Sequence, residues 1–222
     1  GNSWQYSWLA PHDARGLFDR MGGDAAALER LDHLFRLPPE AQNRATFFGV
    51  VYRLDQHAPG NEHDMQVPWM YPFAGAPWGT QRELAEIRTL YRPTLDGLPG
   101  NDDLGSLSAF HAFSALGFGP VTPGAPFHVV GSPQFERAVI TPAGRKPFTV
   151  EAPGASATAP YVRRATLNGK PLERAWFHES HLARRGGTLR LEMGSEPNRD
   201  WATAPKHRPP SASDAPLSAF GC

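Results

Sequence analysis

The sequence predicts an α+β fold, in which part of a larger helical domain is followed by an antiparallel β module. Apolar residues recur at helical spacing from Gly1 to about Leu116, whereas from about Phe127 they fall in short alternating or β-branched segments. Gly/Pro-rich loops, notably 57–79 and 94–100, separate the expected helices and are long enough to carry a site. We therefore expect a helical region at 1–124, the β module at 125–197, and a Pro/Ser/Ala-rich tail at 198–222 that is extended or disordered.

Four apolar runs predict the helices. The first follows Asp24, a residue suited to an N-cap, and is stopped by Pro38-Pro39. The third begins near Thr80 and ends before Pro93, and the fourth follows Asp103. The runs are Leu28, Leu31, Leu34 and Phe35; Phe47, Phe48, Val51 and Leu54; Leu84, Ile87, Leu90 and Tyr91; and Leu107, Phe110, Phe113 and Leu116.

Six short segments predict the strands of the β module. Leu189, Leu191 and Met193 alternate with charged residues, as one half-buried strand should. Asn168-Gly169 is a strong signal for a type I′ hairpin between two of the strands. The expected strands are Phe127–Val130, Phe135–Ile140, Phe148–Glu151, Tyr161–Leu167, Leu172–Phe177 and Thr188–Met193.

Charge and composition exclude several classes of function. The 222 residues carry 22 Lys+Arg and 22 Asp+Glu, so no net charge favours nucleic acid or an anionic membrane. No apolar run approaches membrane-spanning length. The only cysteine is Cys222, which argues against a disulfide, a Cys-based zinc site and a Cys nucleophile. Gly1 opens an aromatic-rich stretch without an initiator Met, and we expect the chain to be a fragment.

The turn Asn101-Asp102-Asp103 is the first candidate for catalysis. It follows a Pro-Gly pair and precedes a helical run, which predicts carboxylates in the first turn of a helix, held by backbone N–H groups. Carboxylates fixed in this way suit a general base or a metal ligand. The alternative is an ordinary N-cap with a solvated acidic turn.

Two further clusters carry polar chemistry. Residues 60–71 place Asn61, Glu62 and His63 among other polar groups, followed by Trp and Tyr; such oxygen-rich sets suit Ca²⁺, although a polar surface loop is the alternative. Near the start of the chain, Gln5 lies among tryptophans, and it either reaches a ligand or is buried in a core helix. His12 is either a sugar contact or a structural residue.

Other catalytic signatures are absent from the sequence. It contains no HExxH, GxSxG or P-loop motif. His178 and His181 flank Glu179 in the β module, and we expect them to lie in a turn between strands with a structural role.

The clusters, in this order and followed by the β module, resemble glycoside hydrolase family 92, the calcium-dependent exo-acting α-mannosidases. The resemblance covers residues 1 to about 198 and implies the C-terminal portion of the catalytic region, namely part of an (α/α)6 barrel and the final β segment. The matching strings are Gly1-Asn-Ser-Trp-Gln-Tyr-Ser-Trp8 with Pro11-His-Asp13, Gly60-Asn-Glu62, Pro68-Trp-Met-Tyr71, Ala76-Pro-Trp-Gly-Thr-Gln81, Leu98-Pro-Gly-Asn-Asp-Asp-Leu-Gly-Ser-Leu-Ser-Ala-Phe110, Ala115-Leu-Gly-Phe-Gly-Pro120, Val130-Gly-Ser-Pro133, Leu167-Asn-Gly-Lys170 and Gly186-Gly-Thr-Leu189.

The resemblance implies inverting hydrolysis of terminal mannose, with α-1,2 linkages as the expected type. It puts the base on Asp103, beside Asp102, whereas Asn101 stands where the family has an acidic residue. The catalytic acid is expected immediately before Gly1, so this fragment alone should be inactive. Substrate contacts are expected from Glu62, His63, Trp4, Trp78 and His12.

Calcium is the cofactor that the resemblance implies, with Asn61, Glu62 and Gln5 as its expected ligands. His63 stands where the family usually has a proline. The expected partners are mannose-containing glycans and the upstream part of the same protein, which comprises an N-terminal β-sandwich and the first part of the barrel. Export to the periplasm or the extracellular space is expected. The alternative function is a non-catalytic carbohydrate-binding or structural module.

Overall fold

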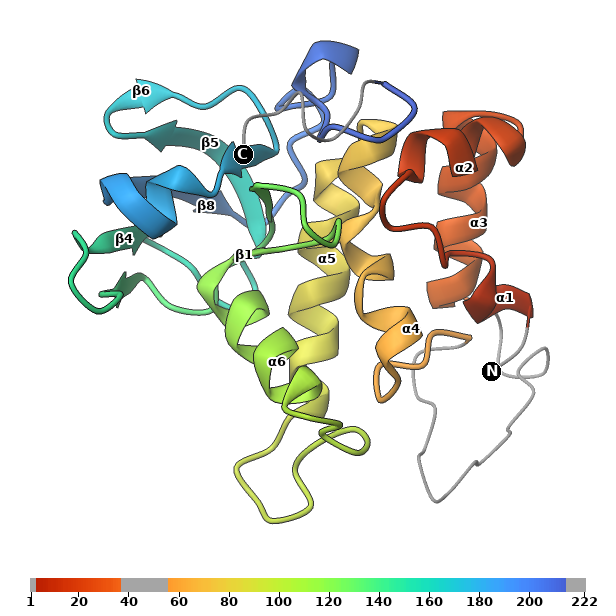
Figure 1. Ribbon diagram of the computed structural model, residues 1–222, viewed down its shortest axis with the longest axis horizontal. Coiled ribbons are helices and arrows are strands. Elements are labelled where there is room, and N and C mark those ends of the chain that lie inside the picture. Colours follow the sequence, from red (N-terminus) through yellow and green to blue (C-terminus); the bar gives the residue numbers. More distant parts are fainter. Residues whose placement is uncertain (1–2, 37–55, 215–222) are drawn as a thin grey trace.

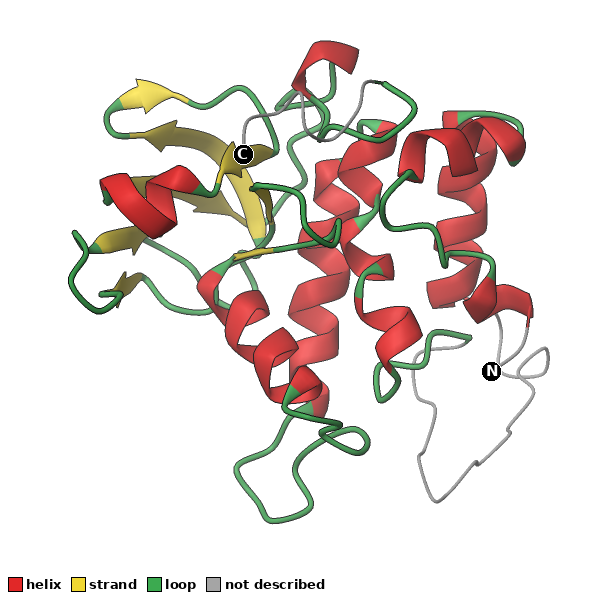
Figure 2. Cartoon of the chain, in the orientation of Figure 1, coloured by secondary structure: helices red, strands yellow, loops and turns green. Residues whose placement is uncertain are grey.

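The computed structural model describes residues 3–36 and 56–214. Helices occupy one side of the molecule and β-sheets the other, as Figure 1 and Figure 2 show. The predicted helix at Phe47–Leu54 and the stop at Pro38-Pro39 lie outside the described residues. In the parts of the chain that are described, no helix combines the length and the apolarity needed to cross a membrane.

The predicted helices in the described region are confirmed, with small shifts at their ends. Asp24 is the first residue of its helix rather than a cap, and its carboxylate pairs with Arg15 and Arg208 at 2.6 and 2.7 Å. The helices are α1 (Ser3–Tyr6), α2 (Ala14–Arg20), α3 (Asp24–Arg36), α4 (Glu62–Met65), α5 (Pro77–Ile87) and α6 (Ser106–Leu116), with short 3-10 turns at η2 (Val67–Trp69), η3 (Tyr71–Ala74), η4 (Arg88–Leu90) and η6 (Pro205–His207) and a π-helical turn at η5 (His181–Arg185).

The strands form two sheets within the described residues. The first has the order β1-β2-β7 and the second the order β3-β4-β8-β5-β6. The predicted hairpin is confirmed: Asn168 and Gly169 have φ of 52° and 76° and join β5 to β6. The strands are β1 (Phe118–Gly119), β2 (Phe127–Val130), β3 (Arg137–Ile140), β4 (Phe148–Glu151), β5 (Tyr161–Leu167), β6 (Lys170–Pro171), β7 (Trp176–His178) and β8 (Gly187–Gly194).

The prediction of a purely antiparallel β module is wrong at one strand pair. β4 and β8 run parallel, with Phe148 opposite Gly187 and Glu151 opposite Arg190, while the other pairs of strands are antiparallel. A parallel pair needs a long crossover, and residues 152–186 supply it through β5, β6 and β7. The alternation of side chains along a strand is the same for both directions, so the sequence pattern could not distinguish them.

Strand β2 is buried on both faces because it separates two hydrophobic cores. Phe127 and Val129 belong to the core of the helical side, whereas Val130 belongs to the core of the five-stranded sheet. His128 packs on the same side as Val130, with its ring 5.3 Å from the ring of Phe118. The predicted boundary at 124/125 therefore falls within the three-stranded sheet, between β1 and β2.

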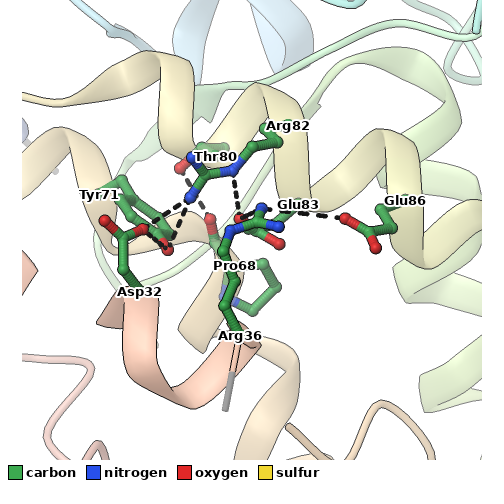
Figure 3. Close-up of polar contacts among 8 residues, drawn as sticks. All are labelled: Asp32, Arg36, Pro68, Tyr71, Thr80, Arg82, Glu83 and Glu86. Atoms are coloured by element: carbon green, nitrogen blue, oxygen red, sulfur yellow. Dashed lines mark hydrogen bonds and ion pairs between the residues drawn. The ribbon is translucent and has the colours of Figure 1, made fainter. Parts of the chain in front are cut away.

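An ionic network around the buried carboxylate of Glu83 joins α3 to α5 (Figure 3). The carboxylate of Glu83 is 1% exposed and pairs with Arg36 at 2.8 Å and with Arg82 at 2.6 Å. Arg82 also pairs with Asp32 at 2.7 Å, and the hydroxyl of Tyr71 donates to the same carboxylate at 3.0 Å. A buried carboxylate is tolerated only with such partners, so the network fixes how the two helices pack.

The C-terminal segment, predicted to be extended or disordered, follows a defined irregular path over residues 198–214. Asn198 Nδ2 donates to the carbonyl of Arg163, and Trp201 Nε1 donates to the carbonyl of Leu172. The segment then crosses the end of the helical layer, where Ser211 is fully buried and its Oγ donates to Asp13 at 2.9 Å. The segment contains few large apolar residues, and side-chain hydrogen bonds and buried prolines hold it in place instead. Residues 215–222 lie outside the described part of the chain.

Candidate active site

Three segments that are distant in the sequence meet at one end of the helical layer. The turn before α4 touches the turn before α6: a Cβ on Gly100 would lie 2.5 Å from the carbonyl oxygen of Gly60. Helix α1 contacts α4, and the ring of Tyr6 stacks on the ring of His63 at 4.7 Å and 7°. The structure therefore brings together the three clusters that carried the sequence predictions.

Asp102 and Asp103 have different surroundings in the turn before α6. The carboxylate of Asp102 accepts hydrogen bonds from the backbone N–H and the hydroxyl of Ser108, both at 2.8 Å. It thus satisfies a free N–H in the first turn of the helix, which is the capping role. Asp103 is exposed and lies before the helix, which begins at Ser106 rather than at the carboxylates.

The backbone of this turn is left-handed at three successive residues. Asp103, Leu104 and Gly105 have φ of 36°, 59° and 84°. Aspartate and glycine accept such values readily, but leucine does so at a cost of about 1 kcal/mol or more.

The carboxylate of Asp103 faces that of Glu62, the first residue of α4. A hydrogen bond to Glu62, with desolvation and the negative charges of Glu62 and Asp102, raises the pKa of Asp103. Both side chains are exposed at the junction of the two turns. Two facing carboxylates repel each other, and a shared proton or a cation would relieve that repulsion.

The turn that carries Asn61 and Glu62 rests on buried polar residues. Asp64 is fully buried, and burial raises its pKa to about 7. His57 is also fully buried, and burial lowers its pKa to about 4, so its ring is neutral near neutral pH. The sequence pattern placed Asp64 only within a polar cluster and gave no sign of a role for His57, because no local pattern indicates that these side chains are buried.

Gln5 and Asn61 lie beside this turn. Gln5 is 5% exposed and its Nε2 donates to the carbonyl of Gln56 at 2.7 Å, which ties α1 to the start of the turn. Asn61 is half-buried at the N-cap position of α4. Asn101 is exposed in the opposite turn.

Two of the predicted substrate contacts lie away from this junction. Trp78 is in the first turn of α5, beside Arg199 of the C-terminal segment at 5.1 Å, whereas the other end of α5 leads to the Asn101 turn. His12 is exposed, and its carbonyl accepts from the N–H of Ala212 in the same segment. The structure does not bring these two residues to the Asp103 turn.

Trp4 lines a separate cavity of about 290 Å³ on the surface of α3. The guanidinium of Arg30 lies over its ring at 4.8 Å, and His33 meets the ring edge-on at 6.3 Å. His181 lies between β7 and β8, as predicted, whereas His178 is the last residue of β7 rather than part of the turn; its Nδ1 accepts the N–H of Ser180 at 3.0 Å.

The donors at the junction match the chemistry of calcium in kind. Among residues 3–36 and 56–214 there is no group of three or more His, Cys, Asp or Glu side chains arranged to hold a metal ion. Calcium also accepts amide, water and substrate oxygens, and a divalent cation would relieve the repulsion between Glu62 and Asp103. The residues therefore fit a calcium ion that takes part of its coordination from other oxygens.

The chain is similar to known proteins in sequence and in structure. Residues 1–195 match the glycosyl hydrolase family 92 catalytic domain. A protein of Arthroderma benhamiae described as an uncharacterized secreted glycosidase is 32% identical over 213 residues, which are 94% of this chain and 25% of that protein.

Solved structures are also similar to this chain. A family GH92 α-mannosidase from Bacteroides thetaiotaomicron, in complex with mannoimidazole, has a TM-score of 0.86 and 30% identity over 95% of this chain and 28% of its own. A family GH92 inverting mannosidase from Bacteroides thetaiotaomicron has a TM-score of 0.82 and 33% identity over 96% of this chain and 30% of its own. The chain thus spans between 25% and 30% of the length of these relatives.

Proposed function

The chain belongs to glycosyl hydrolase family 92, and from this premise we propose that the whole protein is an exo-acting α-mannosidase. It releases terminal mannose from glycans with inversion of the anomeric configuration, and α-1,2 linkages are its preferred class. The mannoimidazole-bound mannosidase and the inverting mannosidase among the relatives support this substrate and this stereochemistry. The observation that carries the proposal is the facing pair Glu62 and Asp103, exposed where three segments meet.

Asp103 acts as the general base. Its carboxylate takes a proton from a water molecule while the water oxygen bonds to the anomeric carbon and the glycosidic C–O bond breaks. The leaving oxygen takes a proton from a carboxylic acid on the other face of the sugar, about 6.5–9.5 Å from the base in inverting enzymes. We propose that this acid comes from another part of the whole protein, since the chain spans only 25% to 30% of the length of its relatives.

The surroundings of Asp103 suit this role. Its carboxylate is exposed to solvent, where a water molecule can reach it, and it lies beside Glu62 rather than being tied to the helix as Asp102 is. Asp102 is a positioning residue, since its carboxylate is bound to Ser108 and fixes the turn on α6. Asn101 offers an amide that can orient the same water without taking its proton.

Calcium is the proposed cofactor, held by Asn61, Glu62 and Gln5. When bound, it supplies a positive charge that attracts the 2- and 3-hydroxyls of the sugar and favours a distorted ring. The amide and carboxylate oxygens of these residues are the donor types that calcium prefers. His63 and Trp4 remain proposed substrate contacts, and Glu62 is proposed for both roles.

The helices of this chain are proposed to be the second part of an (α/α)6 barrel. Upstream sequence of the same protein supplies the rest of the barrel and an N-terminal β-sandwich. The low coverage of the relatives supports this arrangement, and the secreted relative supports export of the protein.

The test uses the whole protein with Asp103→Asn and Asp102→Asn as a matched pair. Asparagine tolerates the left-handed φ of 36° at Asp103, so that variant loses the base and keeps the backbone. We expect Asp103→Asn to lower kcat by a factor of roughly 10² to 10⁴, with an unchanged melting temperature. Release of the inverted sugar anomer, followed by NMR, and its loss with EDTA check the stereochemistry and the calcium.

Asp102→Asn keeps an oxygen for Ser108 and is expected to retain most of the activity. Near-normal kcat in Asp103→Asn would contradict the assignment of the base. Binding of mannosides by the whole protein without any hydrolysis would favour a non-catalytic carbohydrate-binding module instead.

A further inference from the structure

We propose that Asp64 is a positioning residue, which holds the Asn61-Glu62 turn in its working geometry. The inference rests on the proposed function of that turn. Asp64 follows Glu62 by two residues, and it is fully buried while Glu62 is exposed. It therefore acts from beneath the site rather than on the substrate.

Two hydrogen bonds that involve Ala58 hold the turn together. Its Oδ2 accepts the N–H of Ala58 at 2.6 Å, and the carbonyl of Ala58 in turn accepts the N–H of Asn61 at 3.0 Å. Ala58, at the start of the turn, is thereby linked to both Asn61 and Asp64. At 2.6 Å, the bond from Ala58 is at the short end for an N–H donor and an oxygen acceptor.

Histidines on both sides extend this support. His57 Nε2 donates to the backbone carbonyl of Asp64 at 3.1 Å, and its ring packs on Phe35 at 4.6 Å. His63 Nε2 lies 3.8 Å from Asp64 Oδ1, and both atoms are buried without a hydrogen-bond partner among the described residues. A shift of about 1 Å would join them in a hydrogen bond, so the ring stacked on Tyr6 is also within reach of Asp64.

The turn needs support of this kind because its own sequence gives it little rigidity. Gly60 precedes it, no proline occurs from 60 to 64, and α4 has only four residues. A helix of one turn is not stable by itself in water. Contacts with residues before the turn must therefore help to hold Glu62 opposite Asp103, and Asp64 makes two of them, with Ala58 and His57.

The test measures calcium binding by isothermal titration calorimetry on the whole, metal-free protein, below the melting temperature of each variant. We expect Asp64→Ala to weaken calcium binding about tenfold or more, because the anchoring hydrogen bond is lost. KM for a mannoside should rise more than kcat falls, and hydrogen exchange at 58–62 should speed up. Asp64→Asn keeps an oxygen for Ala58 N–H and should restore calcium binding to within about threefold of wild type.

Asp24→Ala is the matched control. It removes another hydrogen-bonded carboxylate, one that ties Arg15 and Arg208 far from the turn, and it should lower the melting temperature without changing calcium binding. His63→Ala removes the stack on Tyr6 and is the second variant if Asp64→Ala does not fold. It should weaken calcium binding about threefold.

Unchanged calcium binding in Asp64→Ala would overturn the inference, as would equal losses in Asp64→Asn and Asp64→Ala. If Asp64→Ala does not fold, His63→Ala takes its place in the test. Calcium affinity at the wild-type level in that variant would then overturn the inference. A wild-type protein that neither binds calcium nor cleaves mannosides contradicts the proposed function instead, and hydrogen exchange at 58–62 then still tests the support by Asp64.

Discussion

Removal of the Asp13 carboxylate should release the C-terminal segment from the helices. Asp13 is the N-cap of α2, where its Oδ1 accepts the N–H of Gly16 at 3.1 Å. The same carboxylate accepts from Ser211 Oγ at 2.9 Å, from Ser213 N at 2.9 Å and from Ser213 Oγ at 2.6 Å. Asp13→Ala removes one capping bond and three bonds to the segment.

The size of the effect follows from these four bonds. Loss of the cap costs about 1 kcal/mol. The three bonds to the segment are worth about 1 kcal/mol each, because they are partly exposed to water. Docking of 209–214 should therefore weaken by roughly 3 kcal/mol, or about two powers of ten in its opening equilibrium.

Hydrogen exchange measured by mass spectrometry on the whole protein reports this opening directly. We expect exchange at 211–214 to be about a hundred times faster in Asp13→Ala, and exchange in β5 and β8 to be little changed. Asp19→Ala is the control, because Asp19 is an exposed residue on the same helix. Equal exchange at 211–214 in wild type and Asp13→Ala would refute the reasoning.

Three further predictions concern the pKa of Asp13 and the close contacts made at Gly16 and Gly100. Burial alone would raise the pKa of Asp13, but hydrogen bonds from Ser213 and Gly16 help to lower it to about 2 from the usual 3.8. The stability from these bonds is therefore present above about pH 4 and is lost as the pH falls toward 2. Unfolding curves followed by fluorescence at pH 2, 3 and 5 check this. Asp13→Asn should abolish this part of the pH dependence of stability. Gly16→Ala should destabilise despite the better helix propensity of alanine, because its Cβ would lie 2.3 Å from Asp13 Oδ2 and 2.5 Å from Ser213 Oγ; a melting temperature at or above wild type would contradict this. Gly100→Ala should push the two active-site turns apart at Gly60, lowering kcat/KM and calcium affinity together, and normal values of both would show that the contact is not needed.

Local patterns predicted the elements of this fold well. The apolar stripes gave α3, α5 and α6, and alternation gave β2, β4 and β5 with the observed bounds. These elements were predictable because their signal lies within each segment. The strand expected at Leu172–Phe177 is confined to Trp176–His178, since Leu172 still bonds to Ala165 beside the β5–β6 hairpin.

Properties that depend on distant segments were not predictable from the pattern. The parallel pairing of β4 with β8 depends on a crossover of 35 residues, from 152 to 186, and not on either strand. The packing of 198–214 depends on Asp13 and Asp24, which lie almost 200 residues away. Polar composition indicated disorder there because it cannot report long-range hydrogen bonds.

The candidate site shows the same division. The sequence predicted Asp102 and Asp103 together at a helix start; in the structure Asp102 takes the capping role, whereas the catalytic role of Asp103 stays a prediction. The meeting of this turn with Glu62 depends on the close approach of Gly60 and Gly100. No local pattern could show that contact.

Strand β2 makes the helices and the sheets a single cooperative unit. Its residues Phe127 and Val129 belong to one core, and His128 and Val130 pack on the other. Without this strand, each core would be incomplete. A cut at 124/125 would expose large apolar side chains on whichever side loses the strand. The β module therefore cannot be exchanged for another domain without repacking the helices, and any substitution in β2 must suit two interiors at once.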